Sequence, residues 1–238
     1  MMSGLTELLY LDDSYLRRFK ARIVETVRDG VVLDRTAFHP TGGGLLSDRG
    51  AITYAGQIYE VLEVLQEGES IIHRIGGGTP PVGGEVEAWL DWDRRYSMMR
   101  LHTGVHVLSA VMMEKTSATI TGNSVGPEQA RVDFSLESFD RSIMEECVST
   151  ANRLLSEGRE VRVYYMEREK VLATPGMIKL AAKMPPNLPV LRIVEIAGVD
   201  IQADGGPHVR NTSEVGRMRI LKLENKGKAN RRIYIAVE

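Results

Sequence analysis

The sequence contains a single cysteine, Cys147, among its 238 residues. An internal disulfide is therefore excluded, and this scarcity is typical of proteins in a reducing compartment. No apolar run approaches the roughly 20 residues that a membrane-spanning helix needs. The N-terminal residues also lack the basic start, apolar block and small-residue cleavage site of a secretory signal. We therefore expect a cytoplasmic protein that does not enter a membrane.

Net charge is also nearly absent, and a value of −2 gives no global indication of a nucleic-acid partner. The charge is nevertheless uneven, because residues 217–232 contain many basic residues and one acid, Glu224. The basic residues of this tract are Arg217, Arg219, Lys222, Lys226, Lys228, Arg231 and Arg232. Such a tract can bind phosphates, or it can be a solvated hairpin whose charges protect a sheet edge. Charge alone favours neither interpretation.

Residues 1–93 contain short apolar and β-branched runs separated by turn signals. Arg28-Asp29-Gly30 and Ala55-Gly56 each separate two such runs, which is the pattern of a β-hairpin. Two further runs, at residues 70–75 and 85–92, flank a loop rich in glycine and proline. Closely spaced strands of this kind predict a small β-barrel or a sandwich. We therefore expect residues 1–93 to form a barrel-like N-terminal domain.

Residues 94–238 show a different pattern, in which helices alternate with strands. Apolar residues recur at steps of three and four between residues 94 and 115, which predicts an amphipathic helix. These residues are Met98, Leu101, Val105, Leu108 and Met112. A second helix is expected from about Phe139 to Glu157, with Gly158 as its stop signal.

Five side chains of this second helix are expected to face inward. They are Ile143, Cys147, Ala151, Leu154 and Leu155. Because Cys147 lies on this stripe, we interpret it as a core residue. Strands are expected at residues 130–135, 160–166, 190–196, 215–224 and 231–237. The predicted fold class is thus α+β, with a β-barrel domain followed by a domain of helices and antiparallel sheet.

His102 and His106 lie four residues apart in the first predicted helix, so both rings project from the same face. This spacing lets one rigid element present two imidazoles to one metal ion. The same spacing also occurs on helix surfaces and in packed cores, so it does not establish a metal site alone.

A second pair of candidate ligands, Asp204 and His208, is also four residues apart. Gly205, Gly206 and Pro207 exclude a regular helix between them and predict a tight loop in which the backbone passes close to an ion. His102, His106, Asp204 and His208 would form a set of nitrogen and oxygen ligands that suits one zinc ion. The simpler interpretation of the loop is a Gly-Pro turn with an incidental histidine.

Ordered motifs across most of the chain resemble a known family. HTGVH at residues 102–106 and DGGPHVRNTSEVG at residues 204–216 resemble the HxxxH and CxxxH zinc motifs of alanyl-tRNA synthetase editing domains and of the freestanding AlaX proteins. The match extends to the glycine-rich segment 37–50, the strand region 122–135 and the C-terminal hairpin 225–237. With its N-terminal β domain and no long helical extension, the sequence most resembles the medium-sized class, AlaX-M.

Two residues depart from the family pattern. Asp204 stands where the family usually has cysteine, and a carboxylate in place of a thiolate should alter metal affinity and selectivity. Leu45 stands where the glycine-rich motif usually has glutamine, so a role of that glutamine near the substrate cannot be transferred.

The resemblance implies an enzyme that hydrolyses the ester of a mischarged Ser-tRNA(Ala), or Gly-tRNA(Ala), at a zinc site containing His102 and His106. The partner is then the acceptor end of tRNA(Ala), while the oligomeric state is open. Thr103 corresponds to a family position that helps to distinguish seryl from alanyl substrates. The metal could activate water or polarise the ester, or it could mainly orient the substrate.

Two further groups of residues are expected to contact this substrate. Gly42, Gly43 and Gly44 could let the backbone approach the aminoacylated end, although without the family they suggest a plain loop. The candidates for phosphate contacts are Lys226, Lys228, Arg231 and Arg232. Other interpretations of the whole protein are a tRNA-binding or structural zinc module with little catalysis, and a zinc hydrolase of small-molecule esters.

Overall fold

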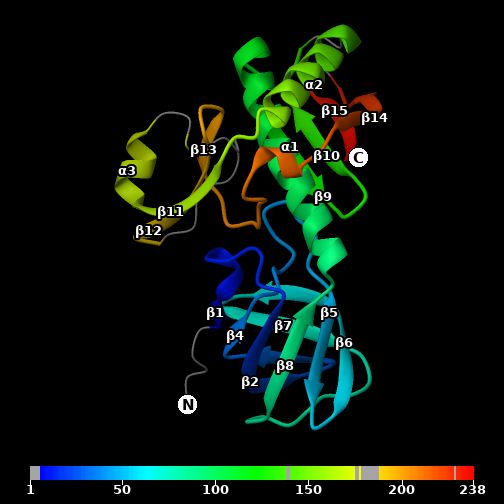
Figure 1. The fold of residues 1–238 in the computed structure, drawn as a ribbon, viewed down its shortest axis with the longest axis vertical. Helices are drawn as coiled ribbons and strands as arrows, with labels where there is room; N and C mark the ends of the chain where they lie inside the picture. Colours follow the sequence, from blue (N-terminus) through cyan, green and yellow to red (C-terminus); the bar gives the residue numbers. More distant parts are fainter. Residues whose placement is uncertain (1–5, 138–139, 175–176, 178–187, 228) are drawn as a thin grey trace. The chain divides into compact units, whose positions relative to one another are not determined.

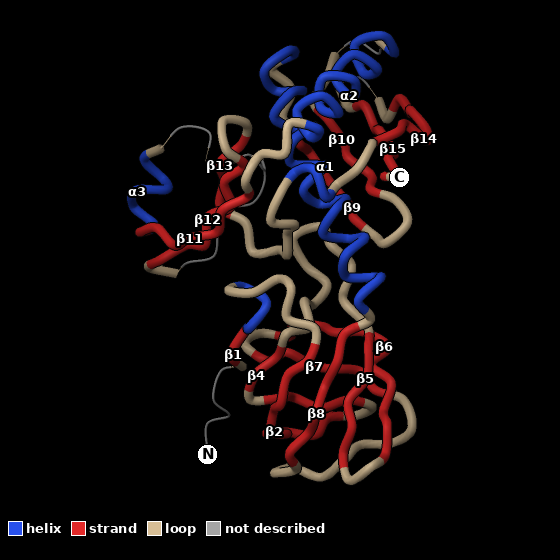
Figure 2. Tube along the Cα trace, in the orientation of Figure 1, coloured by secondary structure: helices blue, strands red, loops and turns tan. Residues whose placement is uncertain are grey.

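The computed structural model describes residues 6–137, 140–174, 177, 188–227 and 229–238 (Figure 1). The chain divides into two compact units, Met1–Tyr96 and Ser97–Glu238. Figure 2 shows that strands make up most of the first unit, whereas the second contains both helices and strands. None of the helices in the described ranges is long and apolar enough to cross a membrane.

The first unit contains a closed antiparallel barrel, which confirms the predicted fold class and decides between barrel and sandwich. Its strands follow the order β2-β3-β7-β6-β5-β8, and β8 pairs with β2 to close the ring. Their bounds are β2 (Arg18–Val27), β3 (Gly30–Leu33), β5 (Gly50–Tyr54), β6 (Gln57–Glu67), β7 (Ser70–Ile75) and β8 (Glu85–Leu90). A short 3₁₀ turn (Leu9–Leu11) and the parallel pair β1 (Glu7–Leu8) and β4 (Arg35–Thr36) complete the unit.

Strand periodicity explains how the barrel fills its interior. Phe19, Ala21 and Ile23 alternate along β2 and are buried, whereas the residues between them are exposed. Both predicted hairpins form, and Asp29 and Ala55 adopt the positive φ angles (56° and 48°) that tight hairpin turns require. The inward residues of all six strands therefore form one apolar core.

The second unit combines two antiparallel sheets with helices. The four-stranded sheet has the order β14-β15-β10-β9, and the three-stranded sheet has the order β11-β12-β13. The strand bounds are β9 (Ile120–Val125), β10 (Ala130–Phe134), β11 (Val161–Glu167), β12 (Val190–Ile196), β13 (Asp200–Ala203), β14 (Met218–Asn225) and β15 (Arg231–Val237). The helices are α1 (Trp92–Thr116), α2 (Arg141–Ser156), α3 (Arg168–Ala173) and a 3₁₀ turn (Thr212–Glu214).

Helix α1 is more deeply buried than an amphipathic helix would be. The predicted apolar positions are buried, but so is every residue from Leu101 to Ser109. A helix buried on all sides keeps its polar side chains away from water, so each must find a partner inside the protein. This requirement applies directly to His102 and His106.

Helix α2 begins at Arg141, after Asp140 accepts a hydrogen bond from the Ser142 amide as N-cap. The predicted start at Phe139 lies outside the described residues. Cys147 is buried as predicted, and Gly158 ends the helix with a positive φ of 67°. Met144 and Val148 are also buried, whereas the predicted Ile143 and Leu154 are only half-buried, so the inward stripe is rotated toward the former pair.

Candidate metal centre

Helix α1 positions the first two candidate ligands. His102 and His106 are both buried, and their ring centroids lie 4.8 Å apart. One turn of helix separates them, so the helix backbone itself fixes their spacing.

The loop that follows β13 positions the other two. Strand β13 ends at Ala203, and the chain then turns through Asp204-Gly205-Gly206-Pro207 to His208. The loop is held locally by the Gly206 amide, which donates to Asp204 Oδ1 at 2.6 Å. His208 stacks on His102 with a centroid separation of 4.1 Å.

The four side chains converge on one point. Each offers one possible ligand atom, and these atoms all lie within 4.8 Å of one another. The Nε2 atoms of His102, His106 and His208 lie 3.6, 3.8 and 3.3 Å from the Asp204 carboxylate. The structure therefore brings together all four predicted ligands in the arrangement that a small cation needs.

The opposite ring nitrogen of each histidine is already occupied. His102 Nδ1 lies 3.3 Å from the Pro207 carbonyl oxygen, and His106 Nδ1 lies 3.0 Å from Asp200 Oδ2. His208 Nδ1 lies 3.0 Å from Thr103 Oγ1. These contacts fix the orientation of each ring and leave Nε2 directed at the shared point, as is usual for metal-binding histidines.

Thr103 lies behind His208 in this arrangement. It is fully buried, and its Oγ1 also accepts a hydrogen bond from the Val209 amide at 3.3 Å. The structure thus connects Thr103 to the centre through one of the candidate ligands. Its predicted contact with the substrate is a separate matter and stays a prediction.

Burial and mutual charge set the protonation of the centre. Burial lowers the pKa of His102 well below its usual value and that of His208 to about 4, and the neighbouring histidines add to both effects. Burial also lowers the pKa of His106, but hydrogen bonds to Asp200 and Asp204 outweigh it and raise the value to about 9. Burial would raise the pKa of Asp204, yet His102 and its neighbours hold it well below its usual range.

The centre thus presents a carboxylate and two neutral imidazoles, the forms that coordinate metals. The raised pKa of His106 favours its protonated form, which must lose a proton when an ion binds. The donor set and its outer hydrogen bonds therefore fit a bound cation.

The two glycines of the loop differ in their surroundings. A Cβ added at Gly206 would lie 2.7 Å from His102 Cε1 and 3.0 Å from its Nδ1, which is too close for any side chain. A Cβ at Gly205 would meet nothing within 4 Å. Only Gly206 therefore has to be a glycine for the backbone of the loop to pass this close to the centre.

Sequence reasoning missed three residues of the centre. Asp200 and Gln202 both contact His106 Nδ1, at 3.0 and 2.8 Å. Arg192 donates to the carbonyl oxygens of Asp204 and Gly206 at 2.8 and 3.0 Å and so anchors the loop. In a strand that leads into Asp204, residues 200 and 202 lie on the same face as residue 204. This alternation is the sequence signal that could have identified Asp200 and Gln202.

The triglycine motif belongs to the first unit. Gly42 and Leu45 exchange backbone hydrogen bonds of 3.0 and 2.8 Å, and Gly43 and Gly44 between them have positive φ angles of 60° and 92°. The motif is thus a tight two-residue turn whose glycines are needed for its conformation. Leu45, the residue that replaces the family's glutamine, is buried.

The basic tract of the C-terminal hairpin is largely paired. Arg232 binds Asp133 through two contacts of 2.6 and 2.9 Å, and Lys226 lies 3.2 Å from Glu224. Arg231 is only 4% exposed and donates to the carbonyl oxygens of Glu137, Gly227 and Asn230. Lys228 lies outside the described residues.

Strand β14, which carries the start of this tract, is an edge strand, so protection of a sheet edge accounts for part of the charge. Arg231 holds its own hairpin, whereas Lys226 and Arg232 are the described candidates that reach the surface in part. The phosphate contacts stay a prediction.

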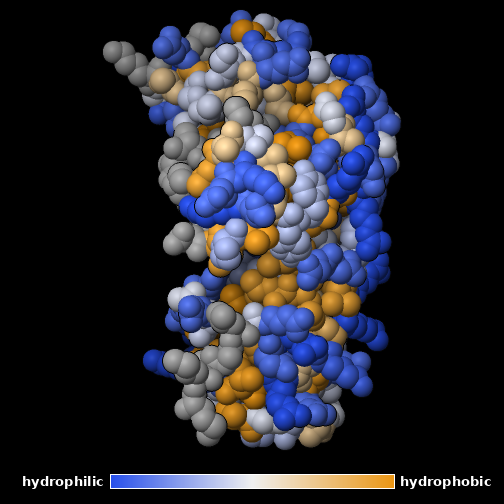
Figure 3. All heavy atoms as spheres, turned by 90° about the vertical axis from the view of Figure 1, so that its left-hand side faces the viewer, coloured by the Kyte–Doolittle hydropathy of each residue, from blue (hydrophilic) through white to orange (hydrophobic). Residues whose placement is uncertain are grey.

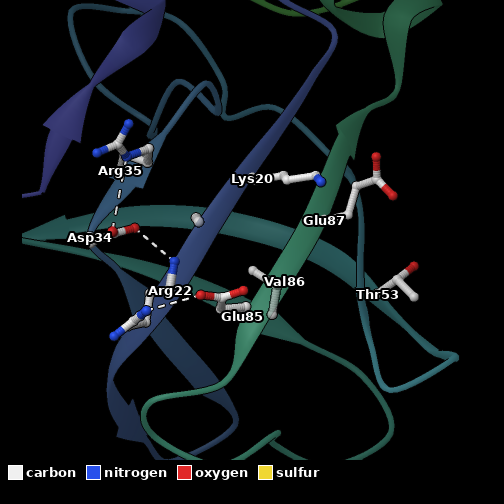
Figure 4. A pocket seen from close by; sticks show the side chains of 9 residues that line it. Lys20, Arg22, Asp34, Arg35, Thr53, Glu85, Val86 and Glu87 are labelled. Carbon is white, nitrogen blue, oxygen red and sulfur yellow. Dashed lines mark hydrogen bonds and ion pairs between the residues drawn. The ribbon is translucent and has the colours of Figure 1, made fainter.

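A surface groove on the barrel offers no comparable chemistry. Its lining alternates acids and bases, including Arg22 with Glu85 at 2.9 Å and Arg35 with Asp34 at 3.9 Å (Figure 4). The histidines of this unit, His39 and His73, do not join any metal-binding group among the described residues. The centre at His102 is therefore the candidate functional site.

Comparison with known proteins supports a relation to tRNA synthetases and editing proteins. A family model for the threonyl and alanyl tRNA synthetase second additional domain matches residues 191–234, and one for class II (A) tRNA synthetases matches residues 11–94. The chain is 46% identical to the alanyl-tRNA editing protein AlaX-M of Saccharolobus solfataricus, over 98% of this chain and 100% of that protein. It is 41% identical to the AlaX-M protein of Methanosarcina barkeri over 98% of this chain and 99% of that one.

The alanine–tRNA ligase of Pyrobaculum neutrophilum is 35% identical over 92% of this chain but only 25% of the ligase. This chain is thus similar to one portion of a synthetase and to the entire length of the freestanding proteins.

Proposed function

The chain belongs to the AlaX-M family of alanyl-tRNA editing proteins, and we propose that it hydrolyses the ester bond of mischarged Ser-tRNA(Ala) at the centre formed by His102, His106, Asp204 and His208. Its enzyme class is that of the family, an aminoacyl-tRNA deacylase. We further propose that one zinc ion occupies the centre and that the enzyme acts in the cytoplasm.

One observation carries the proposal of a metal-dependent site. Three histidine Nε2 atoms point at the Asp204 carboxylate, while each Nδ1 is held by a partner on another part of the unit. A packed core pair of histidines would not require three rings whose Nε2 atoms are all directed at one carboxylate. The arrangement supports metal binding with His102, His106 and His208 as nitrogen ligands and Asp204 as the oxygen ligand.

The direction of substrate entry follows from exposure. The Asp204 side chain is 19% exposed, whereas the three histidine side chains are at most 6% exposed. A substrate ester therefore reaches the centre from the side of Asp204, and the histidines form its closed wall. An ion held by His102, His106, Asp204 and His208 would supply positive charge to polarise the ester carbonyl or to orient the amino group of the substrate.

The chemistry of tRNA charging explains why the substrate is a wrong amino acid. A synthetase pocket for alanine cannot strongly reject a side chain that only adds a hydroxyl, so a separate hydrolytic site is needed. We propose that Thr103 contributes to this discrimination by setting the position of His208, with which it shares a hydrogen bond. Glycine, which is smaller than alanine, is a second candidate for removal.

The tRNA backbone is proposed to contact the partly exposed cations Lys226 and Arg232, and the Gly42-Gly43-Gly44 turn is proposed to let the acceptor end approach the backbone. Since Lys226 pairs at the surface with Glu224, its replacement by glutamate should weaken tRNA binding without loss of metal. The slope of log affinity against log salt concentration should fall by about one for each phosphate interaction that the substitution removes. An unchanged slope would move the RNA-binding face elsewhere.

Metal analysis combined with a deacylation assay tests the main proposal. The purified protein should contain about one zinc ion per chain, as a four-ligand site of this kind binds. It should release serine from Ser-tRNA(Ala) and spare Ala-tRNA(Ala). Protein without metal would exclude the ligand set, and metal without deacylation would favour a structural or tRNA-binding module.

A further inference from the structure

We propose that Tyr165 is a stacking platform for the base of the nucleoside that carries the ester, the terminal adenosine of tRNA. The inference rests on the proposed function, because it names the part of the substrate that lies next to the ester. Tyr165 lies on the three-stranded sheet, which also supports the loop of the metal centre.

Strand register places Tyr165 in line with the centre. Tyr165 of β11 lies opposite Arg192 of β12. Ile193 of β12 lies opposite Ala203 of β13, and the Asp204 amide continues this ladder by donating to the Arg192 carbonyl at 3.2 Å. Tyr165, Arg192 and Asp204 thus form one row across the sheet, and residues directly opposite one another project from the same face.

The face in question is the one that carries the metal centre. Asp200 and Gln202 on β13 both reach His106, and alternation along the strand directs residue 204 to the same side. The opposite face is covered by α3, because Val171 packs there with Leu191 and Ile193 in an apolar cluster. Tyr165 therefore shares a surface with the centre and not with the core behind the sheet.

Tyr165 is also accessible on this surface. Tyr165 is 50% exposed, and Val163, two residues earlier on the same face, is 39% exposed. Both lie on β11, which is an edge strand. Figure 3 views the molecule from the side on which α3, the helix that covers the opposite face of this sheet, lies in Figure 1. A half-exposed aromatic ring next to an aliphatic side chain is a surface on which a base can stack.

The spacing suits an aminoacyl nucleoside. Neighbouring strands are about 4.8 Å apart, so Tyr165 lies roughly 10 Å from the row position of Asp204. In an adenosine ester, about four bonds of roughly 1.5 Å join the 3′ oxygen to the base, and the acyl group and purine add their own lengths. The base of an ester held at the centre is therefore within reach of Tyr165.

Arg192 makes this spacing rigid. Its buried guanidinium holds the carbonyl oxygens of Asp204 and Gly206, so the loop of the centre is attached to the strand that separates it from β11. The platform and the centre are thus two parts of one hydrogen-bonded sheet. Their separation does not depend on a flexible connection.

The test uses the metal-loaded full chain and a seryl amide of 3′-amino-3′-deoxyadenosine, a substrate analogue that cannot be hydrolysed. Its dissociation constant is measured by calorimetry for the unaltered protein, Tyr165→Ala and Tyr165→Phe. Tyr165→Ala should weaken binding about tenfold, which is within the range that one stacked base contributes, whereas Tyr165→Phe should bind normally. The KM for Ser-tRNA(Ala) should rise by a similar factor in Tyr165→Ala, with metal content unchanged.

Two controls separate stacking from disturbance of the sheet. Arg162→Ala changes an exposed residue on the opposite face of the same strand and should leave binding unchanged. A seryl amide that keeps the ribose but lacks the base should bind Tyr165→Ala and the unaltered protein equally. Equal binding of the full analogue by Tyr165→Ala and the unaltered protein would overturn the inference, and so would an effect of Arg162→Ala as large as that of Tyr165→Ala.

The two proposals fail in different ways. If the unaltered protein binds the analogue in a Tyr165-dependent manner but does not deacylate tRNA, the hydrolytic function is refuted and the platform stands. If it deacylates tRNA but the analogue binds without regard to Tyr165, the platform is refuted and the function stands.

Discussion

Two regions of the molecule contain deeply buried histidines, and only one of them is a candidate site. His73 in the barrel and His208 in the second unit are both buried, and burial lowers the pKa of each to about 4. His73 uses both ring nitrogens internally, with Nε2 2.8 Å from Thr36 Oγ1 and Nδ1 3.3 Å from the Val31 carbonyl. His208 uses Nδ1 in this way and directs Nε2 at a carboxylate and two other rings.

Burial and a shifted pKa therefore do not distinguish a metal ligand from a core histidine. The distinguishing feature is the destination of the second nitrogen. In the barrel, Nε2 of His73 contacts one hydroxyl group. In the second unit, the Nε2 atoms of three histidines are directed at the same point. This difference can be tested by substitutions that act on one region and leave the other intact.

The largest effect is expected from removal of a candidate ligand. His106→Ala should abolish stoichiometric metal binding, and deacylation should fall by more than the roughly 10- to 100-fold typical of the loss of an outer partner. His73→Gln, which keeps a polar group near Thr36, should retain both metal and activity. Metal analysis and the Ser-tRNA(Ala) assay measure the two variants side by side, with circular dichroism to verify folding. Activity retained in His106→Ala would remove the distinction between the two regions.

A nearly equal loss is expected from a single methyl group in the loop. Gly206→Ala would place a Cβ 2.7 Å from a carbon of the His102 ring, so the ring or the loop must move and metal affinity should fall strongly. Gly205→Ala, one residue earlier, adds the same methyl group to open space and should bind metal normally. Competition with a coloured zinc chelator measures both affinities. Equal affinities would show that the loop can adjust without disturbing His102.

A smaller effect is expected from the outer partner of His106. Asp200→Ala removes the carboxylate that holds His106 Nδ1 and should reduce metal affinity or activity by about 10- to 100-fold. Asp200→Asn keeps an oxygen at the same place and should lose less. The same assays rank the unaltered protein, Asp200→Asn and Asp200→Ala by metal affinity and by activity. If Asp200→Ala matched the unaltered enzyme, hydrogen bonding of the Nδ1 atoms would not be what separates His106 from His73.

The smallest effect is expected from His73, whose protonation in acid should change only the stability of the fold. Folding lowers the pKa of His73 from 6.5 to about 4, so the neutral ring stabilises the fold fully above pH 6.5. This stabilisation is lost as pH falls through about 4, and the difference corresponds to about 3 kcal/mol. The free energy of unfolding of the unaltered protein should therefore fall by about this amount relative to that of His73→Gln between pH 7 and pH 4. A constant difference in urea titrations would contradict the assignment, and metal release in acid affects both proteins alike.

Much of the fold follows from local patterns in the sequence. The barrel is predictable because Phe19, Ala21 and Ile23 alternate in a run bounded by a turn signal, and α1 is predictable from its apolar spacing. Strand β13 is not, because it has only four residues and leads into Gly205-Gly206-Pro207, whose turn signal dominates the segment. The missed strand is the reason that Asp200 and Gln202 were not assigned to the centre.

Long-range polar partners were equally out of reach of the sequence. Arg231 resembles a solvated cation in a basic tract, yet it holds the carbonyl oxygen of Glu137, which lies 94 residues earlier. Asp48 lies near the glycine-rich turn in the sequence, but it forms a fully buried ion pair with Arg95 on α1. Such pairings depend on which segments pack together, and no local spacing encodes that.

The hydrogen bond between Thr103 and His208 joins residues 105 positions apart, and the candidate ligands of α1 and of the loop are joined across the same long segment. An ion held by both groups acts as a reversible cross-link that closes a long loop containing α2, α3 and the three-stranded sheet. Closing a loop of this length has a large entropic cost in the unfolded chain, which metal bound only in the native state offsets. The midpoint of thermal unfolding should then rise with the logarithm of free zinc concentration, so that in the proposed enzyme zinc would stabilise the second unit as well as support its activity.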